Sequence, residues 1–139
     1  MPVKTADTGV VEPVEAVSGA CMYLPRHVFD EIGGFDEAYF LHVEDLDICR
    51  RVRDAGYGVG VARTLHALHA QGSSSRHRPL FVSWHKHRGM WRYFRKFDPE
   101  AANPIVRGLV WLGVWAHFAL SIPRHGWSLL SSATKRRDP

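Results

Sequence analysis

Only two or three short segments of the chain have the pattern of β-strands, and helical patterns separate them. Residues 17–24 are a short apolar run that we expect to be a buried strand, residues 57–62 a second, and residues 64–69 a third. Strands that alternate with helices predict an α/β fold. Two or three strands are few for a complete domain of this class. The sequence therefore predicts part of an α/β domain.

The 139 residues are enough for one domain with its own core. Residues 1–16 are polar, and we expect a flexible lead-in before the α/β part at residues 17–78. Cys21 and Cys49 match neither a zinc site nor a disulfide framework, which favours a reducing compartment. No secretory signal pattern opens the sequence.

Helical patterns follow from local capping and charge signals. We expect helices at residues 26–32, 44–55, 79–98 and 103–122, followed by a basic tail at 123–139. Gly33 and Gly34 are suited to end the first helix, and Gly56 to end the second. Spacing of three residues predicts one buried stripe on the second helix, formed by Leu46, Cys49 and Val52.

Charge is divided unevenly along the chain. Residues 1–55 hold 11 acids and 5 bases, whereas residues 56–139 hold 3 acids and 13 bases. A basic second part favours an anionic partner such as a phosphate group, a nucleic acid or a membrane surface. We exclude nucleic acid, because the bases match no recognition motif and the acidic part would repel phosphate.

The segment at residues 103–122 is almost entirely apolar, with Arg107 and His117 as its ionisable residues. Its length is at the lower end of the about 20 residues that cross a bilayer. Trp111 and Trp115 are four residues apart, and tryptophan favours the boundary between lipid and water. We therefore expect a membrane-interfacial helix rather than a span.

Acidic residues crowd the start of the helix at 44–55. Glu44, Asp45 and Asp47 fit ordinary compensation of the helix dipole, and equally a carboxylate that serves as general base or metal ligand. His66 and His69 are three apart on an expected strand, so they face opposite sides and cannot form a pair on one face.

Several motifs occur in a fixed order. They are Ser18-Gly19-Ala20-Cys21, Gly33-Gly34-Phe35-Asp36-Glu37, Glu44-Asp45-Leu46-Asp47-Ile48-Cys49-Arg50, Gly56-Tyr57, and His69 before Gly72-Ser73-Ser74. Together they resemble the acceptor half of family 2 glycosyltransferases, in the rhamnosyltransferase-like and galactofuranosyltransferase-like branch. The resemblance covers about residues 17–97 and implies part of a GT-A fold, an α/β fold that binds nucleotide-sugars.

The resemblance implies an inverting sugar transfer from a nucleotide-sugar to a polysaccharide or lipid-linked acceptor. Asp45 is implied to be the general base for the acceptor hydroxyl, and Glu44 to orient the acceptor or the loop. Asp47 is expected to cap the helix. His69 is implied to bind a divalent ion, Mn²⁺ or Mg²⁺, with His66 as the alternative. Substrate-binding roles are implied for Gly19, Asp36, Arg76 and Arg78.

A whole enzyme of this kind has a preceding nucleotide-binding half with a DxD metal motif, and no such motif precedes residue 17. We therefore expect the C-terminal part of a glycosyltransferase, which works with a separate nucleotide-binding half. We place it in the cytoplasm, peripheral to the inner face of the cell membrane. The alternative is a catalytically inactive fragment that serves as a membrane-surface or interaction module.

Overall fold

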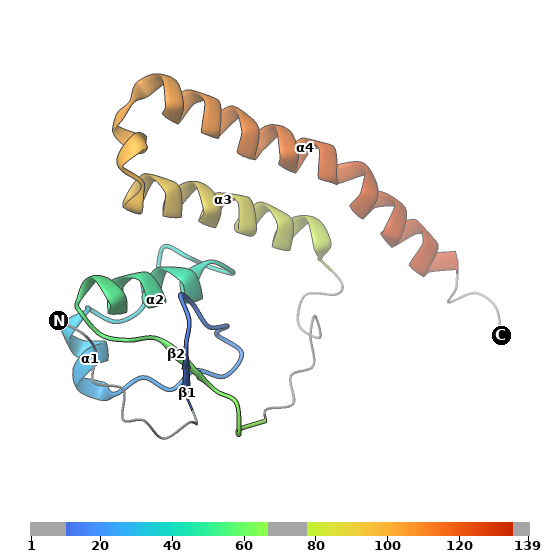
Figure 1. Cartoon of the computed structure of the whole chain (residues 1–139). Helices are drawn as coiled ribbons and strands as arrows, with labels where there is room; N and C mark the ends of the chain where they lie inside the picture. The colour runs from blue at the N-terminus through green and yellow to red at the C-terminus, as the bar shows by residue number, and fades with distance from the viewer. Residues whose placement is uncertain (1–10, 67–77, 135–139) are drawn as a thin grey trace. The chain divides into compact units, whose positions relative to one another are not determined.

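The computed structural model describes residues 11–66 and 78–134, with side chains of the last helix described as far as residue 123. The chain divides into two compact units, Met1–Gln71 and Gly72–Pro139. The first contains β1 (Val11–Pro13), α1 (Arg26–Glu31), α2 (Glu44–Asp54) and β2 (Gly60–Ala62) (Figure 1). The second contains α3 (Pro79–Phe97), the short 3₁₀ helix η1 (Pro99–Ala102) and α4 (Pro104–Thr134). The described residues thus form a mainly helical α/β structure with one small sheet.

The sheet consists of β1 and β2, which pair antiparallel with Val11 opposite Ala62. The expected lead-in at residues 1–16 is therefore wrong for β1, because this segment finds a pairing partner about 50 residues away. A Cβ on Gly60 would lie 2.6 Å from Val11 Cγ1, so the pairing requires glycine there. Next to the sheet, Arg63 binds Glu12 and holds the pKa of that carboxyl below its usual value.

The other expected strands differ from the structure. Residues 17–24 form turns and irregular backbone instead of a strand, because their partners are side chains of α2 rather than a neighbouring strand. The strand expected at 57–62 is reduced to β2. Of the strand expected at 64–69, residues 64–66 are turn and irregular backbone, and the rest lies outside the described residues.

The turn after α1 brings the chain back towards its own helix. Gly33 and Gly34 have φ of 78° and 71°, the left-handed conformation that the sequence predicts for them. Gly34 N–H donates to Phe29 O at 2.8 Å, which closes the turn. The Phe29 ring packs edge-on against Phe35, with centroids 5.9 Å apart.

One face of α2 forms much of the core of the first unit. Its buried residues are Asp47, Ile48, Cys49 and Val52. Leu46, expected in the buried stripe, is 43% exposed. The buried face is centred on Ile48, which the expected stripe of Leu46, Cys49 and Val52 does not include. Gly56 follows with φ of 87°, as expected of a residue that ends a helix.

The second unit is an antiparallel hairpin of α3 and α4 joined by η1 (Figure 1). The Trp84 ring lies 4.7 Å from Trp115 and 5.5 Å from Phe118, measured between centroids. Asn103 Oδ1 accepts from Ile105 N at 3.0 Å and caps α4, as its sequence position predicts. The helix continues beyond the expected end at 122 and includes Pro123, because a proline removes one helical hydrogen bond without always ending the helix.

Candidate active site

The start of α2 has an unusual backbone. His42 and Val43, which directly precede the helix, have φ of 64° and 72°. A β-branched residue rarely adopts this left-handed conformation, which costs about 1–2 kcal/mol per residue. Val43 is buried, so packing holds it in place. Strained backbone of this kind concentrates at functional sites, and here it positions Glu44 and Asp45 in the first helical turn.

The Asp45 carboxylate is oriented by two backbone N–H groups. Its Oδ2 accepts from Gly19 N at 3.2 Å and its Oδ1 accepts from Leu46 N at 2.9 Å. One turn further along α2, Cys49 Sγ lies 3.9 Å from Val17 O and holds the same segment. The structure therefore brings together two of the expected site residues, Gly19 and Asp45.

Glu44 lies beside Asp45 and is half-buried. Among the described residues, its Oε2 is enclosed and has no hydrogen-bond partner. An enclosed carboxyl oxygen without a donor is costly, and a hydroxyl or ammonium group of a ligand would relieve that cost. The expected role of Glu44 in orienting the acceptor or the loop stays a prediction.

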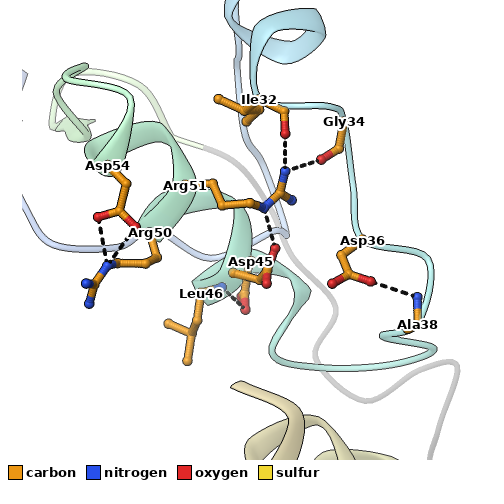
Figure 2. Close-up of polar contacts among 10 residues, drawn as sticks. Ile32, Gly34, Asp36, Ala38, Asp45, Leu46, Arg50, Arg51 and Asp54 are labelled. Atoms are coloured by element: carbon orange, nitrogen blue, oxygen red, sulfur yellow. Dashed lines mark hydrogen bonds and ion pairs between the residues drawn. The ribbon is translucent and has the colours of Figure 1, made fainter. Parts of the chain in front are cut away.

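Asp47 does not cap the helix as expected, because its side chain is fully buried and paired within α2. Arg51 Nε lies 2.6 Å from Asp47 Oδ2. The Nη1 of Arg51 donates to Ile32 O and Gly34 O, each at 2.7 Å (Figure 2). The pair thus ties α2 to the glycine turn. Sequence reasoning did not select Arg51, although its spacing of four residues from Asp47 is the signal for such a pair.

Asp36 lies in the loop between the glycine turn and α2. Its Oδ1 accepts from Ala38 N at 3.1 Å (Figure 2), and its carbonyl oxygen accepts from Tyr39 N at 3.0 Å. These bonds shape the loop. The expected substrate-binding role of Asp36 stays a prediction.

The remaining expected site residues, in the later part of the chain, stay predictions. His69 and Arg76 lie outside the described residues, and Arg78 directly precedes α3 in the second unit. His66 is exposed near the end of the described part of the first unit. Within residues 11–66 and 78–123, no three His, Cys, Asp or Glu side chains are grouped so that they could hold a metal ion.

The chain is similar to an N-acetylglucosaminyl-diphospho-decaprenol L-rhamnosyltransferase of Mycobacterium tuberculosis, with 33% identity over 91 residues, or 58% of this chain. It is also similar to the rhamnosyltransferase WbbL of Escherichia coli, with 34% identity over 40% of this chain and 21% of the relative. The low-salt glycan biosynthesis hexosyltransferase Agl10 of Haloferax volcanii is 31% identical over 44% of this chain and 20% of the relative. No family model and no solved structure matches the chain.

These relatives are glycosyltransferases by name, and two of them are rhamnosyltransferases. They confirm the resemblance to rhamnosyltransferase-like glycosyltransferases. The chain spans 30% of the length of the mycobacterial relative.

Proposed function

We propose that the chain forms the acceptor side of an inverting family 2 glycosyltransferase with a GT-A fold. The reaction is sugar transfer from a nucleotide-sugar to a glycan or lipid-linked acceptor. The observation that supports it is the Asp45 carboxylate, which two backbone N–H groups orient at the start of α2. The glycosyltransferase relatives support the class of reaction.

Asp45 is suited to be the general base. The bonds from Gly19 and Leu46 use one lone pair on each carboxylate oxygen. The other lone pairs remain for the hydroxyl group of the sugar acceptor. The carboxylate takes that proton while the acceptor oxygen forms its bond to the anomeric carbon. The nucleoside diphosphate leaves with the electron pair of the broken C–O bond, and this single displacement inverts the anomeric carbon. Glu44, the neighbouring carboxylate, orients the acceptor or the loop and so helps to set the angle of attack.

A divalent ion is part of the proposal, with His69 as the ligand from this chain. No metal site forms within the described residues, and the proposal takes the further ligands from the nucleotide-binding half. When bound, the ion would offset the charge of the leaving diphosphate. Arg76 and Arg78 would pair with the same diphosphate through charged hydrogen bonds.

Asp45→Asn tests the proposal in a preparation that supplies a nucleotide-binding half. The amide cannot take the proton, so transfer should fall by about 10²–10⁴-fold, the usual effect of losing a general base. Asp54→Asn is the matched control on the same helix, because Asp54 is exposed and pairs with Arg50. If Asp45→Asn keeps more than about half of the activity, Asp45 is not the base.

A further inference from the structure

α4 has an apolar face that no described residue of the second unit covers. Its segment Pro104–Pro123 has a mean hydropathy of 1.6 and is long and apolar enough to cross a membrane, and its most apolar part is not buried. Ile105, Leu109 and Leu112 are 72%, 64% and 58% exposed. Their spacing of four and three residues places them on one face of the helix.

The opposite face of α4 carries His117 and Ser121, which contact α3. His87 Nδ1 lies 2.7 Å from Ser83 O and must donate to it, so Nε2 of a neutral His87 accepts from His117 Nδ1 at 2.8 Å. Ser83 Oγ and Ser121 Oγ lie 3.3 Å apart. Figure 1 shows α4 alongside α3, and these contacts turn the His117 and Ser121 side chains towards α3.

The hairpin is also strongly basic. The sequences of α3 and α4 contain no aspartate or glutamate. Five bases of α3 are exposed, namely Lys86, Arg88, Arg92, Arg95 and Lys96. An exposed apolar stripe next to an acid-free basic helix complements a bilayer with anionic headgroups, which attract each lysine or arginine near their surface.

We infer that the hairpin docks on an anionic lipid bilayer, with the outer face of α4 in the lipid and both helices parallel to the membrane plane. The packing of α3 against α4 supports the orientation parallel to the membrane. Trp84 packs on Trp115, and His87 bonds to His117, so α3 lies alongside the middle of the apolar helix. If α4 crossed the bilayer, α3 would bring Arg88 and its neighbouring bases into hydrocarbon, which is costly. The parallel orientation leaves them at the headgroups.

This inference does not depend on the proposed sugar transfer, and its test needs neither donor nor acceptor. The full chain is floated with vesicles of phosphatidylglycerol and phosphatidylcholine, and with phosphatidylcholine alone. We expect binding to the anionic vesicles that weakens with added salt. The double variant Leu109→Glu, Leu112→Glu should reduce vesicle binding by at least about tenfold, because it removes two apolar side chains that enter the lipid.

Leu65→Glu is the matched control, because Leu65 is 77% exposed and belongs to the first unit. This variant should leave vesicle binding unchanged. Equal binding of the double variant and the parent would overturn the inference. The inference would also be overturned if the parent chain did not bind vesicles but formed a dimer, and the double variant did not. The apolar face of α4 would then bind a second copy of the chain. Alkaline carbonate should release the bound chain, and retention in the membrane would overturn the parallel orientation.

Discussion

Asp47 and Arg51 form an ion pair at 2.6 Å on α2, with the Asp47 side chain completely buried and that of Arg51 17% exposed. The guanidinium also binds the carbonyl oxygens of Ile32 and Gly34. A buried pair of this kind adds little over apolar residues, but removing one partner leaves a charge without compensation. The pair therefore holds the helix that carries Asp45 against the turn that precedes it.

Arg51→Met should lower the free energy of unfolding by about 3–5 kcal/mol, because the Asp47 carboxylate would remain buried without a partner. Urea denaturation followed by circular dichroism measures this. Arg50→Met is the matched control on the same helix, since Arg50 and Asp54 are 40% and 51% exposed. It should cost at most about 1 kcal/mol. Equal losses in the two variants would contradict the role given to Arg51.

The helices were predictable from the sequence because their signals are local. Pro79 is suited to the first turn of a helix, Asn103 to a cap, and Gly34 to a left-handed turn, and each serves that purpose in the structure. The strands were not predictable in the same way, because β1 pairs with β2, which lies about 50 residues further along the chain. Pairing over such a distance leaves no local pattern.

The site was predictable in its residues and not in its geometry. Asp45 and Gly19 were both selected, but their hydrogen bond joins positions 26 residues apart. The role of Arg51 also depends on contacts across the chain, with carbonyls 17 and 19 residues away. The left-handed backbone at Val43 has no signal in the sequence, because a β-branched residue is unusual in that conformation.

Gly34→Ala should destabilise the first unit more than Gly33→Ala. Both glycines have positive φ, so either substitution brings backbone strain of about 1–2 kcal/mol. A Cβ at Gly34 would also lie 3.1 Å from the Phe29 ring, whereas one at Gly33 meets nothing within 4 Å. Thermal unfolding of the two variants side by side measures the difference. A Gly33 variant that is the less stable of the two would contradict the packing assigned to Phe29.

Tyr57 should ionise at a higher pH than an ordinary tyrosine. Its hydroxyl donates to Glu31 Oε2 at 2.6 Å, and this bond raises the pKa of Tyr57 above 10.0. A raised pKa means that the stabilising contribution is present below the ordinary tyrosine pKa and is lost as the pH rises through the folded-state value. Ultraviolet titration should show Tyr57 ionising at lower pH in Glu31→Gln than in the parent. Tyr57→Phe identifies the signal, and an unchanged titration in Glu31→Gln would contradict the assignment.

Gly19 should act on Asp45 through its N–H group rather than through its lack of a side chain. A Cβ at Gly19 would lie 3.6 Å from Asp45 Cβ, an ordinary contact, so Gly19→Ala should keep the fold and the transfer rate. Gly19→Pro removes the donor that holds Asp45 Oδ2 at 3.2 Å, and the carboxylate can then rotate away from the acceptor hydroxyl. With a nucleotide-binding half supplied, kcat should fall by about 10- to 100-fold in the proline variant, because the base is misplaced. The acceptor KM should change little, which separates lost positioning from lost binding. Equal kcat in the two variants, with unfolding curves that match, would show that Asp45 is oriented without Gly19.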